Sequence, residues 1–284
     1  MRDFVSFAQS HGVLITDLDP SGRIRRCGTV DHPRSKNGAY RWDGRRGFVY
    51  AWDADAIPHW FNDPESKPWS ETEKRAFMAR RQSERAGRMR DYQRAAQRAA
   101  ELIRSASANE HNYFHYKGLP SASGLVLPDG GLLVPMRSLS DEIQGAQIIR
   151  WDGKAMRYDK RMLPGMRAKG AVLRLGSPRV STTILCEGYA TGLSIVMAVR
   201  QMRMDAAVLV CFSDSNLVHA ASLVSGHKAV FADNDASGAG ERAARATGLP
   251  YCMSDVVGED ANDLHQRAGL FAVCGKLMGV RQQN

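Results

Sequence analysis

The chain has 284 residues, 43% of them hydrophobic, which is enough for one large globular domain or two modest ones. No apolar run approaches the roughly 20 residues that span a bilayer, and the N-terminal segment MRDFVSFAQSHG lacks the apolar core of a signal peptide. We therefore expect a cytoplasmic protein without a membrane partner. The five cysteines contain no C-x-x-C pair, so we expect neither a disulfide framework nor a zinc site.

Charge is divided unevenly along the chain, whose formal net charge is +9. Residues 1–180 contain 31 Lys and Arg against 20 Asp and Glu, whereas residues 181–284 contain 8 against 10. A basic part joined to a mildly acidic part is typical of a polyanion-binding surface next to a metal site. The alternative is a basic face that contacts only solvent.

Residues 1–65 are turn-rich and aromatic, and we expect them to form a small β-rich module. Aromatic residues alternate with others on both sides of the turn DGRRG, which predicts a β-hairpin. We expect these side chains to form the buried face of a small sheet, although aromatics among arginines can also stack on bases. They are Tyr40, Trp42, Phe48, Tyr50 and Trp52.

Residues 66–108 are expected to form a basic helical connector. Ser70 and Glu73 predict a capping box at the start of a helix that reaches Arg104, and apolar residues recur in it at helical spacing. The helix carries ten basic residues against five acidic ones. This surplus favours contact with phosphates, although a charged helix usually only faces solvent. Gly87 is a weak point at which the helix could divide in two.

Residues 109–180 have the pattern of strands joined by tight turns. Pro-Asp-Gly-Gly at 128–131 and Trp-Asp-Gly-Lys at 151–154 predict two hairpins. Basic residues are dense between positions 150 and 169, where strand ends and loops are expected. This segment is therefore a better candidate for contact with a template or a nucleotide than the helix is.

Residues 181–284 alternate between apolar strands and amphipathic helices. Strands are expected at STTILC, AAVLVCF, KAVFAD and YCM, with helices between them and a last helix from about Ala261. This rhythm predicts a parallel sheet covered by helices on both faces. In such sheets the functional residues gather at the carboxyl ends of the strands.

Acidic residues stand at two of these strand ends. Glu187 follows ILC and precedes Gly188, and Asp233 and Asp235 follow the strand VFA. Their carboxylates would repel one another at one sheet edge unless a hard cation such as Mg²⁺ bound them. Such a site fits phosphoryl transfer, in which metal ions stabilise the attacking and leaving oxygens. Each motif alone could be ordinary helix-start or turn chemistry, so the indication comes from their order on successive strands.

Residues 181–268 resemble a Toprim domain, the fold shared by bacterial-type primases, topoisomerases and some nucleases. The resemblance lies in Glu187-Gly188, in Ser213-Asp214-Ser215-Asn216-Leu217, which resembles the middle loop of primase-like Toprim domains, in ADNDASGAG around Asp233 and Asp235, and in a later acidic element, Asp260-Ala261-Asn262-Asp263. It implies a Rossmann-like parallel sheet flanked by helices over residues 181–284. It also implies that Glu187, Asp233 and Asp235 are catalytic and that these three and Asp263 hold Mg²⁺ or Mn²⁺. Glu187 either binds the metal or acts as general base toward a 3′-hydroxyl.

The likeness extends upstream, where HNYFHYKGLPSASGL and the segments after it resemble the compact core of plasmid- and phage-type primases. It implies a basic α+β subdomain at residues 109–180 and partners that comprise a single-stranded DNA template, nucleoside triphosphates and a separate replicative helicase. The chain departs from bacterial primases in having no cysteine set for a zinc domain. The resemblance makes five basic residues candidates for gripping template or nucleotide phosphates: Lys117, Arg150, Lys160, Arg161 and Lys169.

The sequence thus predicts a primase-like nucleotidyltransferase that makes short primers on single-stranded DNA. Two other functions use the same fold: a Toprim nuclease or nicking enzyme, and a nucleic-acid-binding replication accessory protein without catalysis. No nucleophilic tyrosine module indicates a topoisomerase. A haloacid-dehalogenase-type phosphatase also has Asp-x-Asp at a strand end, but there the motif opens the domain, whereas two strands precede it here.

Overall fold

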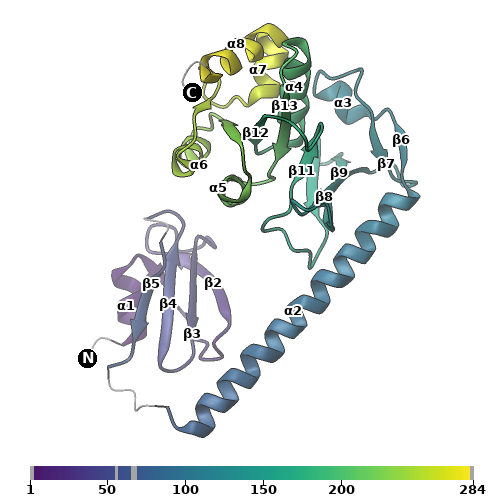
Figure 1. Cartoon of the computed structure of the whole chain (residues 1–284). Coiled ribbons are helices and arrows are strands. Elements are labelled where there is room, and N and C mark those ends of the chain that lie inside the picture. Colours follow the sequence, from purple (N-terminus) through teal and green to yellow (C-terminus); the bar gives the residue numbers. More distant parts are fainter. Residues whose placement is uncertain (1–2, 55–56, 65–68, 282–284) are drawn as a thin grey trace. The chain divides into compact units, whose positions relative to one another are not determined.

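The structure, a computed structural model, describes residues 3–54, 57–64 and 69–281. It contains two compact units, residues 1–80 and 81–284, and each is described by itself (Figure 1). The predicted boundary between residues 65 and 66 lies outside the described residues. Over the ranges that the structure describes, every helix is too short or too polar to cross a membrane.

In its described residues, the first unit has an antiparallel sheet of five strands in sequence order, one short helix and the start of a long helix. The predicted hairpin is confirmed, because β3 and β4 pair around a turn in which Asp43 accepts the backbone N–H groups of Arg45 and Arg46. The core centres on Phe4, which stacks on Trp42 with 4.5 Å between ring centroids. The elements are α1 (Phe4–Ser10), β1 (Val13–Leu14), β2 (Ile24–Thr29), β3 (Gly38–Trp42), β4 (Arg46–Ala51) and β5 (His59–Asn62).

The aromatic residues of the hairpin divide between core and surface. Tyr40 and Trp42 are buried, as the alternation predicts, and Tyr40 hydroxyl donates to the carbonyl of Asp17. Trp52 is instead exposed, and the guanidinium of Arg26 lies 3.7 Å from its ring centroid. Phe48 and Tyr50 are only half-buried, because Val49 and Ala51 of the same strand join the core instead. The predicted buried face is therefore confirmed for Tyr40 and Trp42 and wrong for the other three aromatic residues.

Helix α2 (Glu71–Ser105) runs across the division between the two units without interruption. Its start has the predicted capping box: Glu73 carboxylate accepts the N–H of Ser70 at 2.8 Å, and Ser70 hydroxyl accepts the N–H of Glu73 at 3.2 Å. Gly87 does not divide it, since the helical hydrogen bonds continue through this position. Only its C-terminal part has buried residues, among them Ala99, which packs on the sheet that follows.

The second unit begins with an antiparallel sheet in the order β10-β9-β8-β7-β6. Both predicted hairpin turns are present, one between β7 and β8 and one between β9 and β10. The helix that follows β6 packs its aromatic side chains Tyr113 and Phe114 into the core. The elements are β6 (Ser107–Asn109), α3 (Asn112–Tyr116), β7 (Gly124–Val126), β8 (Leu132–Arg137), β9 (Ile143–Asp152) and β10 (Arg157–Met162).

The rest of the second unit is a three-layer α/β domain, as the sequence predicts. Strands β13, β12, β14 and β15 are parallel, with α4, α7 and α8 on one face and α5 and α6 on the other (Figure 1). The strands are β11 (Leu173–Leu175), β12 (Thr182–Cys186), β13 (Ala206–Val210), β14 (His227–Phe231) and β15 (Tyr251–Cys252). The helices are α4 (Tyr189–Gln201), α5 (Asp214–Leu223), α6 (Ala239–Thr247), α7 (Ala261–Ala268) and α8 (Leu270–Arg281).

Two details differ from the expected α/β pattern. Strand β11, which precedes the predicted start of this domain at residue 181, joins its sheet at the edge and pairs antiparallel with β13. The single last helix is two helices, because Gly269 adopts φ 80° and turns the chain between α7 and α8. A glycine tolerates this backbone without strain, so Gly269 serves as the C-terminal cap of α7.

The antiparallel sheet and the parallel sheet share contacts within the second unit. Asn262 amide on α7 donates to the carbonyl of Lys117 just after α3, at 2.8 Å. Tyr113 and Phe114 pack against Tyr189 at the start of α4. These contacts fix the end of α3 against the helix starts of the parallel sheet.

Candidate active site

Three acidic side chains lie at the carboxyl ends of three adjacent parallel strands. Glu187 follows β12, Asp214 opens α5 just after β13, and Asp233 stands two residues beyond β14. Because β12 lies between β13 and β14, these residues meet at one edge of the sheet. The structure therefore brings the predicted residues Glu187 and Asp233 together and adds Asp214.

Burial and mutual repulsion raise the pKa values of the two central carboxyls. The pKa of Glu187 lies well above its usual range, first because the group is partly buried, then because of a hydrogen bond with Asp214 and its charge. Burial, followed by the charges of Asp260, Asp214 and Asp235, raises the pKa of Asp233 to about 7. Carboxyls that resist ionisation in this way mark a place where a cation would be bound strongly.

One oxygen of Asp233 has no partner in the part of the chain that the structure describes. Oδ1 is buried and accepts no hydrogen bond there. A buried carboxylate oxygen without a partner is costly unless a ligand satisfies it. Among residues 3–54, 57–64 and 69–281, no three His, Cys, Asp or Glu side chains already stand in metal-binding positions. The fit to a hard cation thus rests on the all-oxygen donors and on this unsatisfied atom.

Asp235 is also part of the fold, because its carboxylate accepts hydrogen bonds from the first turn of α6. Its oxygens accept the N–H groups of Gly240 at 2.8 Å and Ala239 at 3.2 Å, and the hydroxyl and N–H of Ser237. The hydrogen bond from Ser237 is the largest of the effects that lower the pKa of Asp235 to about 2. Asp235 is therefore fully ionised at neutral pH, whereas Asp233 titrates close to it.

A glycine is required where α6 meets the strand end. A Cβ atom on Gly240 would lie only 2.3 Å from the carbonyl oxygen of Asp233. The motif Asp-x-Asp-x-Ser-Gly-x-Gly thus combines a backbone close approach with the two carboxylates. At the neighbouring strand end Phe212, with φ 66°, turns the chain before Ser213 caps α5. A bulky residue in this conformation is strained, and such strain is common beside functional sites.

The later acidic element divides into two residues with different surroundings. Asp260 caps α7 through Oδ1, and its Oδ2 accepts the hydroxyl of Thr191 at 2.8 Å. Its charge acts on Asp233. Asp263 instead accepts the N–H of Asp260 and lies 3.9 Å from Nζ of Lys117. Asp263 as a metal ligand stays a prediction, and the contacts place Asp260 nearer to the other acids.

Two of the five predicted basic residues face the acidic cluster. The charges of Asp260, Asp233 and Glu187 all act on Lys160, which comes from β10. They oppose a lowering of its pKa by the surrounding protein and by the nearby Lys117. The antiparallel sheet therefore presents two positive charges to the acids of the parallel sheet.

The other three basic residues lie elsewhere. Arg161 follows Lys160 on the same strand, so it points to the other face, where it pairs with Asp159. Arg150 pairs with Asp129 in the turn between β7 and β8. Lys169 borders a cavity of about 660 Å³ beside α5, together with Asn216 and His219. None of these three is brought to the acidic cluster by the contacts described.

Asp214 is not among the predicted site residues, although the segment Ser213-Asp214-Ser215-Asn216-Leu217 resembles the middle loop of primase-like Toprim domains. Its own signal is weak, because an acid just after a Ser N-cap is ordinary in the first turn of a helix. The informative signal was its position after the strand AAVLV, next to the strand that ends in Glu187. Topology, rather than composition, identifies it.

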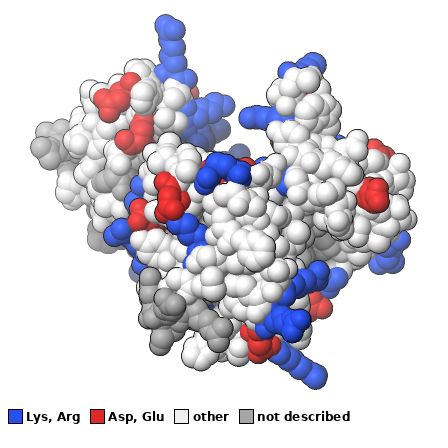
Figure 2. All heavy atoms as spheres, turned by 90° about the horizontal axis from the view of Figure 1, so that it is seen from above, with Lys and Arg blue, Asp and Glu red and all other residues white. Residues whose placement is uncertain are grey.

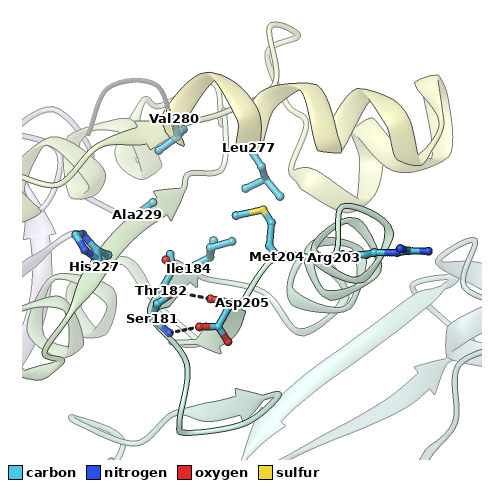
Figure 3. A pocket seen from close by; sticks show the side chains of 10 residues that line it. All are labelled: Ser181, Thr182, Ile184, Arg203, Met204, Asp205, His227, Ala229, Leu277 and Val280. Carbon is cyan, nitrogen blue, oxygen red and sulfur yellow. Dashed lines mark hydrogen bonds between the residues drawn. The ribbon is translucent and has the colours of Figure 1, made fainter.

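A cavity of about 450 Å³ lies at the amino ends of the same parallel strands, under α8 (Figure 3). Its apolar lining includes Ile184, Met204 and Leu277, and at its rim Ser181 N–H donates to the carboxylate of Asp205 at 2.8 Å. Thr182, the first residue of β12, also lines it. The cavity is therefore separated from Glu187 by the length of a strand and is a different place from the acidic site.

The sheet with acids at its carboxyl edge defines the C-terminal part as a Rossmann-like α/β domain. The family model of the Toprim domain matches residues 182–270, so this part of the chain is a Toprim domain. Toprim domains bind divalent metals such as Mg²⁺ and usually occur in enzymes that act on nucleic acids, including primases, nucleases and topoisomerases. A comparison of the chain with curated proteins found no match.

Proposed function

We propose that the protein is a primase-like nucleotidyltransferase that joins nucleotides on a single-stranded DNA template. Glu187, Asp233 and Asp235, with Asp214 and Asp260 beside them, would hold Mg²⁺ or Mn²⁺ at the carboxyl edge of the Toprim sheet. The bound metal would supply charge stabilisation at the transferring phosphate. The same proposal includes four domains, with boundaries after residues 65, 108 and 180. It also includes a cytoplasmic location and a separate helicase as partner.

The observation that carries this proposal is the position of Lys160. It comes from β10, a strand outside the Toprim sheet, and its charge interacts with those of Asp260, Asp233 and Glu187 and of the nearby Lys117. A triphosphate bound between metal and lysines would have its negative charge balanced on two sides. An antiparallel sheet that presents lysines to a metal site is an arrangement suited to binding nucleotides and template together.

The surface charge is in keeping with a nucleic-acid substrate. Lysine and arginine are more widespread than acidic residues on the face that Figure 2 displays. Such a surface attracts a polyanion before any specific contact forms, and the attraction falls steeply with salt. We expect binding to single-stranded DNA to weaken strongly as salt is raised.

The test is primer synthesis on single-stranded DNA with labelled ribonucleotides and Mg²⁺ or Mn²⁺. Wild type is compared with Glu187→Gln and Asp233→Asn, which remove one negative charge and keep the shape of the side chain. Asp141→Asn is the matched control, because this side chain is 85% exposed and asparagine tolerates its φ of 70°. Oligomers from wild type and the control but from neither site variant support the proposal.

Two other outcomes would contradict it. Cleavage or nicking of DNA that needs the same acids, without any oligomer, would assign the nuclease function. Binding of DNA without either activity would assign the accessory role. The acids are common to primase and nuclease, so the product on the gel decides between them.

A further inference from the structure

Three aromatic side chains form a patch on the surface of the antiparallel sheet. Tyr116 ends α3, Trp151 is on β9 and Tyr158 is opposite Trp151 on β10. Their ring centroids are 5.1 to 6.2 Å apart. We name Tyr116, Trp151 and Tyr158 the aromatic platform.

The platform remains open to solvent. Trp151 is 47% exposed and Tyr116 is 54% exposed. The three rings meet at interplanar angles of 63° to 68°, so no member is stacked parallel on another. An aromatic cluster that only stabilised the hairpin would bury these rings more completely. Exposed rings beside positive charge are the features that bind unpaired bases, because every base has a π face.

Lysines connect the platform to the acidic cluster. Tyr158 and Lys160 are two residues apart on β10 and therefore point to the same face. Nζ of Lys117 lies 6.0 Å from the ring centroid of Tyr116, and Nζ of Lys160 lies 6.0 Å from that of Tyr113. Both lysines also lie beside acids of the site. Aromatic rings, then cations, then the acidic cluster follow one another on this side of the unit.

A cavity of about 390 Å³ adjoins the platform. Trp151 and Tyr158 line it together with His111, Asn112 and His115. Asn112 and His115 offer donors and acceptors of hydrogen bonds, as the edge of a base requires. Both ring nitrogens of His111 are already bonded, to the N–H of Tyr113 and the carbonyl of Gly130. The cavity therefore has apolar surface for stacking and polar groups for contact with a base edge.

We propose that the aromatic platform binds unpaired bases of a nucleic-acid single strand and leads its backbone past Lys117 and Lys160 to the acidic cluster. The inference rests on the proposed function for the direction of the strand. The stacking itself requires only exposed bases. A duplex, in which the bases are stacked on one another, would not use the platform.

The test measures binding of a short labelled thymidine oligonucleotide to the full chain, without divalent metal and at fixed salt. Trp151→Ala and Tyr116→Ala are each expected to bind it roughly 5- to 150-fold more weakly than wild type, the usual range for loss of one stacked base. Trp151→Phe keeps a ring and should retain most of the affinity. Trp60→Ala is the control, since this tryptophan is 65% exposed in the other unit.

An abasic oligonucleotide of the same length separates stacking from phosphate contact. Wild type should bind it at least as weakly as Trp151→Ala binds the intact strand, and Trp151→Ala should bind the abasic strand no more weakly than wild type does. Unchanged binding by both alanine variants, or equal losses on intact strand, abasic strand and duplex, would overturn the inference. Circular dichroism spectra and Trp151→Phe show whether a loss comes from misfolding.

The same variants distinguish this inference from the proposed function. If wild type makes primers but Trp151→Ala binds single-stranded DNA normally, the base-binding role of the platform is refuted and the primase function is supported. If the platform variants lose binding to single-stranded DNA while wild type makes no primers, the base-binding role is supported and the primase function is refuted. The two ideas therefore fail on different measurements.

Discussion

Glu187 and Asp214 follow the carboxyl ends of the neighbouring parallel strands β12 and β13, and Asp214 contributes to the raised pKa of Glu187. Two carboxylates placed so close repel each other unless a cation lies between them. A divalent cation would offset this repulsion and bind oxygens from both side chains. Asp214 therefore belongs to the same chemical unit as Glu187.

The first prediction concerns Asp214. Asp214→Asn should lower the affinity for Mg²⁺ about tenfold or more, the usual effect of removing a group that supports a metal ligand. Primer synthesis should fall with it and recover partly at high Mg²⁺. The measurement is Mg²⁺ binding by calorimetry, with Asp141→Asn as control. Equal affinities in the two variants would show that Asp214 has no part in the site.

The two aspartates after β14 should have opposite effects on stability. Asp233→Asn removes a buried, repelled carboxylate, so metal-free protein should melt a few degrees higher, as about 1 kcal/mol would produce in a unit of this size. Asp235→Ala removes the acceptor of the α6 N–H groups and should cost about 1–2 kcal/mol. Both should abolish primer synthesis.

Thermal melting in a chelator checks this pair. A rise for Asp233→Asn and a fall for Asp235→Ala are expected, with wild type between them. A fall for both variants would mean that Asp233 contributes to the metal-free fold rather than opposing it.

A third prediction concerns pH. The pKa of Asp233 rises from its ordinary value of 3.8 to about 7 in the folded chain, so folding favours the protonated form. The stability that this group contributes is full below about pH 4 and is lost as pH rises through about 7. Glu187 is shifted in the same direction. Mg²⁺, which competes with these protons, should raise the melting temperature more at about pH 8 than at about pH 6.

Melting curves with and without Mg²⁺ at the two pH values provide the measurement. Asp233→Asn is the control, because it lacks the titrating group and should reduce both the loss of stability and the benefit of Mg²⁺ at high pH. If Asp233→Asn and wild type respond to pH alike, another group is responsible.

Much of the fold follows from local sequence pattern. The alternation of apolar strands and helices after residue 180 predicts the parallel sheet, and Glu187 and Asp233 are found by reading which residue follows each strand. The sequence does not place Asp214 in the site, because the strand order β13-β12-β14 is not contained in the local pattern. The local pattern also leaves β11 in the upstream part, since its partner β13 lies beyond α4.

The density of basic residues in the sequence identifies the residues that face the acids less well than strand register does. Lys160 and Arg161 are equivalent in composition, but their side chains leave opposite faces of β10, and only the pairing of β10 with β9 decides which face meets the acids. The choice between Asp260 and Asp263 likewise depends on which of them caps α7 and which accepts from the cap. These distinctions require the three-dimensional arrangement.

The neighbours Lys160 and Arg161 provide the fourth prediction. Lys160→Ala should reduce primer synthesis about a hundredfold, because a charge aimed at the transferring phosphates is lost. Arg161→Ala removes an equal charge from the other face and should change activity little, since its ion pair with Asp159 is exposed. Activity at saturating nucleotide compares the two. Similar losses in both would mean that net charge, rather than the position of Lys160, matters.

The last prediction concerns Asn216, which ties the loop before β11 to the end of β13. Its buried amide donates to the carbonyls of Ala171 and Cys211, both at 2.8 Å, and its carbonyl accepts the N–H of Gly170 at 2.6 Å. Asn216→Ala leaves these three backbone groups without a partner, so it should destabilise the second unit by about 2–4 kcal/mol. Denaturant unfolding measures this, with Ser222→Ala on the exposed side of α5 as control. Because the bonds join two segments of one unit, we expect a single lowered transition. Separate transitions for residues 81–180 and 181–284 would instead show that the two parts unfold independently.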